Sequence, residues 1–198
     1  MWEAVERAPG VYNETYLDEI ENLVNKLGAN GIYTLVDAHQ DVLARRLCGE
    51  GMPNFYATDL PHDCEPGILP YIFPSFNFCK SIQDYGYRVD GEGNPVIEDC
   101  QKNQFVDYYF SPESMELFER LFSATPGGLQ DKFIAYWKRV ASRFASNPYV
   151  VGFDPLNEPF PSNIYKDASL FYLPGHFDAT VLQPFYKRIF EEAYLPAS

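Results

Sequence analysis

A polar turn containing one glutamate follows an apolar run late in the chain. The ten residues from Val150 to Pro159 read Val-Val-Gly-Phe-Asp-Pro-Leu-Asn-Glu-Pro, so a strand is expected to deliver Asn157 and Glu158 to its end. A carboxyl group held there, half screened from water, can have its pKa raised until it serves as a general acid. The structural alternative is a polar turn, which any buried parallel strand needs at its exit.

A second polar group follows an earlier apolar run in the same way. The run Ile32 to Val36 leads directly into Asp37-Ala-His-Gln-Asp41. Asp37 and Asp154 could instead cap the segments that follow them, and His39 could be a half-buried histidine with its partners satisfied. Two polar strand ends in succession favour chemistry, because the carboxyl ends of barrel strands carry the active site in (β/α)8 enzymes.

The elements that must position these residues alternate between helix and strand. Apolar residues at helical spacing predict a helix over 17–27, which Gly28 to Gly31 close. The short apolar runs lack alternation, so we predict parallel strands covered on both faces. The remaining predicted elements are helices over 112–122, 130–144 and about 180–194, and a strand over 149–153. This order predicts a parallel α/β sheet whose long loops leave the carboxyl ends of the strands.

A stretch without sustained periodicity, from about 48 to 108, separates the first strand from the later helices. Loops of this length in compact domains are usually lids or binding surfaces. It contains all four cysteines, Cys48, Cys64, Cys79 and Cys100, which predict two disulfides with three connectivities left open. No Cys-x-x-Cys or His-rich spacing accompanies them, so we expect no metal site.

Composition limits the partners of the chain. A net charge of −13 argues against binding nucleic acid or an anionic membrane, since both need a basic surface. No apolar run approaches the ~20 residues that span a bilayer. The hydrophobic content of 46% is that of one globular piece. The cysteines, with a sequon at Asn13, favour the secretory pathway and an extracellular or lysosomal location, although Asn13 would serve equally as a helix N-cap.

Three motifs together resemble a known family. Asp37-Ala-His-Gln-Asp-Val42, Cys48-Gly-Glu-Gly51 and Asn157-Glu158-Pro159 are similar to those of the endoglycoceramidases and their relatives in glycoside hydrolase family 5. The resemblance extends from Trp2-Glu-Ala-Val-Glu6 through the last predicted helix. Asn-Glu-Pro is common to many retaining glycosidases, whereas the Asp-x-His-Gln-Asp strand end is typical of the glycolipid-directed branch.

The resemblance implies roles for five residues. Glu158 would be the general acid/base, and Asn157 would hold the 2-hydroxyl of the sugar being cleaved. His39 would contact sugar and order the pocket. Asp37 and Asp41 would bind sugar hydroxyls, since one carboxylate accepts from two donors. Neither a metal nor a cofactor is implied.

The resemblance also implies a fold, a (β/α)8 TIM barrel present only from its second to about its fourth βα unit. Residues 1–198 would be one partial catalytic domain with a loop on the active-site face at about 48–108. The retaining mechanism needs a nucleophilic carboxylate ~5–5.5 Å from the acid. In the family that carboxylate lies on the seventh strand, so we expect it outside this chain. We expect the chain alone to be inactive and poorly soluble.

The implied activity is hydrolysis of the β-glycosidic bond between oligosaccharide and ceramide in glycosphingolipids, by a monomer. Two alternatives stay open, a β-glucosidase acting on glucosylceramide or steryl glucoside, and a non-catalytic protein that binds glycolipid. The aromatic segments 160–172 and 73–87 could supply sugar platforms and an apolar bed for lipid, or could form small cores within their loops.

Overall fold

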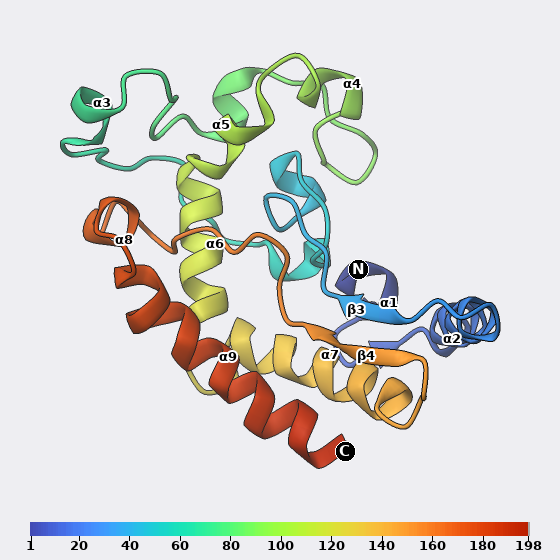
Figure 1. Cartoon of the computed structure of the whole chain (residues 1–198). Helices are drawn as coiled ribbons and strands as arrows, with labels where there is room; N and C mark the ends of the chain where they lie inside the picture. The colour runs from blue at the N-terminus through green and yellow to red at the C-terminus, as the bar shows by residue number, and fades with distance from the viewer. Residues whose placement is uncertain (198) are drawn as a thin grey trace.

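Two parallel strands form the sheet that carries the predicted site, in a computed structural model that describes residues 1–197 (Figure 1). Strand β3 (Thr34–Asp37) pairs with β4 (Val150–Asp154), with Asp37 opposite Asp154. The predicted parallel pairing is confirmed. Both polar segments therefore leave the same edge of the sheet, because parallel strands end side by side.

The predicted helices are also confirmed. They are α2 (Glu14–Ala29), α6 (Pro112–Phe122) and α7 (Leu129–Phe144), followed by one helical stretch made of a π segment (Asp178–Leu182), α9 (Gln183–Ile189) and a second π segment (Phe190–Tyr194). Asn13 is the N-cap of α2, where its side chain accepts a hydrogen bond from the Tyr16 backbone amide. Gly28 closes that helix against the ring of Tyr149, where a Cβ atom would overlap the ring.

The first twelve residues form elements that the sequence did not predict. Helix α1 (Trp2–Val5) leads into a small hairpin of β1 (Glu6–Ala8) and β2 (Val11–Tyr12). Buried Glu6 accepts hydrogen bonds from the Trp2 indole, the Gly10 amide and the Tyr56 hydroxyl. Strands this short carry too few residues for a period to be recognised in the sequence. Long-range contacts such as those of Glu6 hold them in place.

The core lies between the sheet and the helices that cover one of its faces. Trp137 on α7 is fully buried and contacts Phe153 of β4 and Tyr194 of the last π segment. Its indole donates to the backbone oxygen of Pro155 at 3.0 Å. Helix α7 thereby fixes the chain just after β4, three residues before Glu158.

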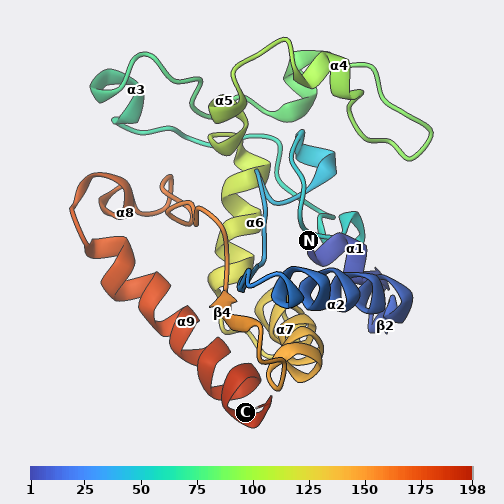
Figure 2. The same cartoon turned by 45° about the vertical axis from the view of Figure 1, so that its right-hand side comes forward.

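The opposite face of the sheet departs from prediction. Leu35 and Val151 are 56% and 66% exposed, so the expectation of strands covered on both faces is wrong for residues 1–197. The reason is the layering, because α2, α7 and the last helix all lie on the other side of these two strands (Figures 1 and 2). A continuous apolar run predicts burial but cannot show which layer supplies it.

The long loops lie together beyond the carboxyl ends of the strands (Figure 1). Between β3 and α6 the chain is irregular apart from short turns and helices, and β4 is followed by a similar segment. The short helices are α3 (Leu69–Ile72), α4 (Ile97–Cys100), α5 (Phe105–Tyr109) and α8 (Ser169–Tyr172). Among the described residues, no helix has both the length and the apolar character needed to cross a bilayer.

Two nested disulfides close the first long loop, as the cysteines predicted. Cys48 pairs with Cys100 and Cys64 with Cys79, each with a Cα–Cα distance of 5.6 Å. The outer bond joins the turn after β3 to the end of α4, 52 residues later. The inner bond spans 15 residues and encloses α3.

We predict that the outer disulfide stabilises the fold more than the inner one. The double substitution Cys48→Ser and Cys100→Ser should lower the free energy of unfolding by about 4 kcal/mol, because it releases the longer loop in the unfolded chain. The matched pair Cys64→Ser and Cys79→Ser should cost about 3 kcal/mol. Urea unfolding measures both, and equal losses would contradict the loop-length argument. Mass spectrometry of the unreduced protein should find no free thiol.

Asp99 anchors the same loop through charge. Its buried carboxylate accepts from the Arg88 guanidinium and backbone amide and from Lys102 at 2.6 Å, and these contacts hold the pKa of Asp99 well below its usual range. A lowered carboxyl pKa stabilises the fold above the unfolded-state pKa, and the effect is lost as pH falls through the folded-state pKa. We therefore predict that Asp99→Asn destabilises the protein at pH 7, and that the difference from the unsubstituted protein shrinks below about pH 4. Thermal unfolding between pH 2 and 7 tests this, with the exposed neighbour Glu98→Gln as the control that should show little change.

Candidate active site

The two strand ends continue into a hydrogen-bonded pair of turns. The Ala38 amide donates to the Asp154 oxygen at 3.1 Å, and the Asn157 amide donates to the Ala38 oxygen at 3.2 Å. The ladder of the parallel strands is thus extended past their last residues. It places 38–41 beside 155–158, although more than a hundred residues separate them in sequence.

Gln40 ties the two turns together from inside. Its side chain is buried, and its amide nitrogen donates to the backbone oxygens of Asn157 and Glu158 at 2.8 and 3.3 Å. Its side-chain oxygen accepts from the Leu43 amide at 3.0 Å. The Asn157 side chain donates back to the Gln40 backbone oxygen at 3.2 Å. One side chain therefore holds the backbone on both sides of Glu158.

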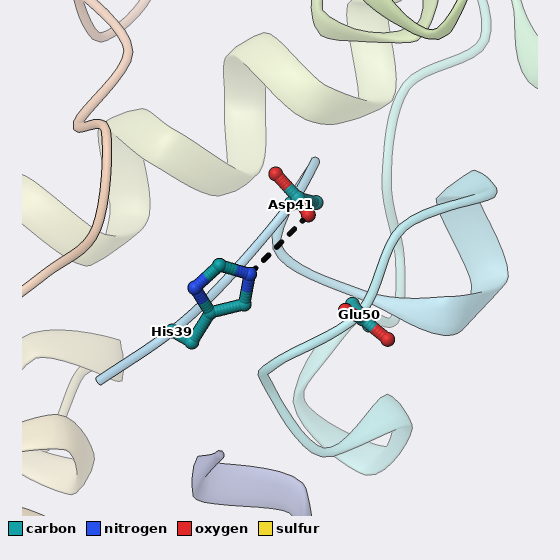
Figure 3. Close-up of side chains that lie close together, drawn as sticks. All are labelled: His39, Asp41 and Glu50. Carbon is teal, nitrogen blue, oxygen red and sulfur yellow. Dashed lines mark ion pairs between the residues drawn. The ribbon is translucent and has the colours of Figure 1, made fainter. Parts of the chain in front are cut away.

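His39 lies between the two predicted carboxylates. Its Nδ1 is 3.3 Å from Asp37 Oδ2. Its Nε2 is 3.5 Å from Asp41 Oδ2, the pair drawn in Figure 3. Both ring nitrogens thus lie within ion-pair distance of a carboxylate. Three of the five residues selected from the sequence form this one row on the carboxyl side of β3.

The carboxylate of Asp37 is the perturbed member of the row. Burial raises the pKa of Asp37, and the charge of Asp154 opposite it in the strand pair raises this pKa further. The neighbouring His39 lowers it. Asp37 Oδ1 is buried and has no hydrogen-bond partner among residues 1–197. An acceptor in that condition is available to a hydroxyl donor.

Glu50 joins the row from the Cys-Gly-Glu-Gly motif. Asp41 and Glu50 exchange both backbone hydrogen bonds, at 2.9 and 2.7 Å. Gly49 permits this approach, because a Cβ there would lie 1.9 Å from the Asp41 oxygen. Gly51 has a φ of 122° and packs against Gln40, so a side chain is excluded there as well. Glu50 belongs to a motif that carries the family resemblance, but no role in the site was expected for it.

One ligand atom from each of His39, Asp41 and Glu50 lies within 4.8 Å of the others, which is close enough to share a cation (Figure 3). The sequence favoured no metal, and we keep that prediction because Asp41 already pairs with the imidazole. Treatment with EDTA should leave activity and thermal stability unchanged. Loss of either, with recovery on adding back one divalent ion, would contradict it.

Glu158 occupies a different environment from the one predicted. Its side chain is exposed, so the expected half-screened position is wrong for the described residues. Its backbone has a φ of 39°, which is sparsely populated for a residue with a side chain, and the turn is held by Gln40 on one side and Pro159 on the other. The carboxylate therefore projects from a fixed turn beyond the sheet edge.

Tyr109 on α5 forms the wall behind this turn. It is buried and stacks on Phe160 with ring centroids 5.1 Å apart. Burial raises the pKa of its hydroxyl, and the nearby charges of Asp41 and Glu158 raise it further. The hydroxyl thus stays protonated close to both carboxylates. Sequence reasoning missed Tyr109 because it lies in the long loop, where no local pattern marks it.

The chain is similar in sequence to curated endoglycoceramidases from two animals. An endoglycoceramidase of Hydra vulgaris is 36% identical over 180 residues, which cover 88% of this chain and 31% of the relative. The endoglycoceramidase of Cyanea nozakii is 36% identical over 177 residues, covering 89% and 32%. The chain is related to the endoglycoceramidases. It spans about a third of the length of these relatives, and no family model matches it.

Solved structures agree with this relationship. Endo-glycoceramidase II from Rhodococcus sp., solved as a lactosyl-enzyme intermediate, aligns with a TM-score of 0.67 at 26% identity, over all of this chain and 37% of that one. The same enzyme has been solved in complex with ganglioside GM3. The resemblance to endoglycoceramidases drawn from the sequence is confirmed, and the α/β arrangement is that of one part of a larger endoglycoceramidase fold.

Proposed function

We propose that the protein carrying this chain hydrolyses the β-glycosidic bond between oligosaccharide and ceramide in glycosphingolipids. The observation that supports this most is the convergence of Glu158, Asn157, His39, Asp37 and Asp41 at one edge of the sheet, in a chain related to endoglycoceramidases. We further propose that the chain is the second to fourth βα units of a (β/α)8 barrel, since its two strands are parallel neighbours with the site at their carboxyl ends.

Glu158 would act as the general acid and then as the general base. Its carboxyl group would protonate the glycosidic oxygen and afterwards take a proton from the attacking water. Its exposure in the described residues leaves it open to a substrate, and its fixed turn removes backbone freedom that would otherwise be lost at the transition state.

Asn157 is oriented for the role that the resemblance implies. Its side-chain nitrogen donates a hydrogen bond to the Gln40 backbone oxygen, while its side-chain oxygen accepts no hydrogen bond from residues 1–197. That oxygen is free to accept from a sugar 2-hydroxyl, a contact that strengthens toward the transition state. Asp37 Oδ1 and the Asp41 carboxylate offer further acceptors to sugar hydroxyls, with His39 holding the two apart.

The nucleophile is proposed to come from outside this chain. A Rhodococcus relative forms a lactosyl-enzyme intermediate, which supports a retaining double displacement here. The disulfides support a protein that folds in an oxidising compartment, and we propose an extracellular or lysosomal enzyme.

Product analysis tests the proposal. The protein carrying this chain is incubated with a glycosphingolipid bearing a fluorescent ceramide and an oligosaccharide of several sugars. We expect intact oligosaccharide and free ceramide as the first products. Release of single glucose units would favour the β-glucosidase alternative, and binding without any product would favour a non-catalytic glycolipid-binding protein.

A further inference from the structure

The tips of the two long loops carry a group of exposed apolar residues. Ile68, Tyr71 and Ile72 lie at α3, and Tyr172 and Leu173 at α8, with exposed fractions between 48% and 87%. We call these five residues the loop-tip patch. Figures 1 and 2 both place α3 and α8 on the same edge of the molecule, and the Phe73 and Phe171 rings beneath them are in contact, with centroids 5.3 Å apart. The patch is thus one surface built from segments a hundred residues apart.

The patch lacks charged side chains in a chain with a large negative net charge. Residues 66–79 and 168–177 contain no Asp, Glu, Lys or Arg, although 22% of the chain is charged and its net charge is −13. Tyr71 and Tyr172 combine an apolar ring with a polar hydroxyl, as do the aromatic residues enriched at membrane interfaces. This surface suits a partner that is itself uncharged overall and presents both apolar and polar groups.

The patch is held in shape from below. Leu69, Phe110, Met115 and Ile164 form a small core under both loop tips. The Cys64–Cys79 disulfide encloses α3, and the Tyr165 hydroxyl bridges the two loops by donating to the Phe110 oxygen and accepting from the Cys79 amide. The aromatic segments therefore do form a small core, and that core presents other apolar residues to solvent.

The patch is continuous with the candidate active site. Phe160 lies two residues after Glu158. Its ring centroid is 5.5 Å from that of Phe110 and 6.5 Å from that of Phe171. Phe171 in turn contacts Phe73 beneath the patch. An unbroken apolar path therefore runs from the turn of Glu158 to the exposed loop tips.

We infer that the loop-tip patch docks the protein on the surface of an uncharged lipid bilayer. The inference rests on the proposed function for its choice of partner, because a ceramide substrate lies in a membrane and the site must approach it. The patch supplies apolar and tyrosine side chains that enter the interface, and the acidic remainder of the protein stays in water. A zwitterionic surface is preferred over an anionic one, since the net charge of −13 is repelled by acidic lipid headgroups.

Vesicle co-sedimentation with phosphatidylcholine tests the inference without requiring turnover. The unsubstituted protein should bind, and the pair Tyr71→Glu and Leu173→Glu should reduce the bound-to-free ratio at least tenfold. The matched control pair Val11→Glu and Leu23→Glu, at similarly exposed apolar residues away from the patch, should bind like the unsubstituted protein. Absence of binding by the unsubstituted protein, or equal binding by the two pairs, would overturn the inference.

Fluorescence gives a second readout that does not depend on charge. Trp2 and Trp137 are buried, so a tryptophan introduced as Tyr71→Trp should dominate any response to lipid. Its emission should shift to shorter wavelength on adding vesicles, whereas Leu23→Trp should not shift. If Tyr71→Trp stays unshifted, or if the glutamate pair instead dissociates a dimer, the patch serves protein contact and the inference is wrong.

An activity assay separates this inference from the proposed function. Hydrolysis of a water-soluble β-glycoside by the protein carrying this chain should be equal for the unsubstituted protein and the patch pair, whereas hydrolysis of vesicle-embedded glycosphingolipid should fall at least tenfold for the pair. Failure to hydrolyse either substrate would remove the proposed function while leaving vesicle binding to decide the docking inference.

Discussion

In the protein carrying this chain, Glu158→Gln is expected to reduce turnover of a natural glycosphingolipid by about 10²–10⁴-fold, because general acid–base catalysis contributes on this scale. The substitution keeps the shape of the side chain and removes its titratable proton. Since Glu158 is exposed and its turn is held through its backbone oxygen by Gln40, the free energy of unfolding should change by less than about 0.5 kcal/mol.

The steady-state rate with fluorescent glycosphingolipid measures this effect, and urea unfolding confirms that the fold is retained. Glu19→Gln, an equally conservative change at an exposed position on α2, is the matched control and should have full activity. Unchanged turnover by Glu158→Gln would remove the assignment of the general acid and, with it, the main support for the proposed function.

Gln40→Leu is expected to lower kcat by about 10–100-fold, because a misplaced catalytic group can cost that much even when it is still present. The substitution removes both donors to the Asn157 and Glu158 backbone oxygens and the acceptor for the Leu43 amide. Leaving buried polar groups unpaired should also destabilise the fold by about 1–3 kcal/mol.

A matched control separates positioning from general stability. Gln130 on α7 is equally buried and donates in the same way to the backbone oxygens of Leu121 and Phe122 at the end of α6, and not to the turn that carries Glu158. Gln130→Leu should destabilise the protein similarly but leave kcat of the folded enzyme unchanged. If the two variants lose activity in the same proportion, Gln40 is structural only.

The regular elements could be predicted because their signals are local. The helix over 129–144 repeats apolar residues at its own period, and the strand ends at 37 and 154 are marked by an abrupt change from apolar to polar residues. The parallel pairing followed from the alternation of elements. The hairpin at 6–12 carried too few residues to show a period.

The parts of the site that could not be predicted depend on long-range contacts. Gln40 lies within the motif that was recognised, but its importance comes from partners 117 and 118 residues away. Tyr109 lies near enough to feel the charge of Glu158, although about fifty residues separate them in sequence. Cys48 pairs with Cys100 because the folded loop brings these distant residues together. Nothing local in the sequence marks that pairing, so three connectivities were left open.

The nested disulfides also determine what a protease can do to the chain. Any single cut between Cys48 and Cys100 leaves the two resulting pieces covalently joined through the outer bond, and a cut between Cys64 and Cys79 leaves them joined through both. The exposed tip at α3 lies inside both disulfide loops and is a segment open to cleavage. A protein nicked at the α3 tip would therefore run as one band on a non-reducing gel and as two after reduction, with Gln40 and Glu158 still held by their hydrogen bonds on the same edge of the sheet.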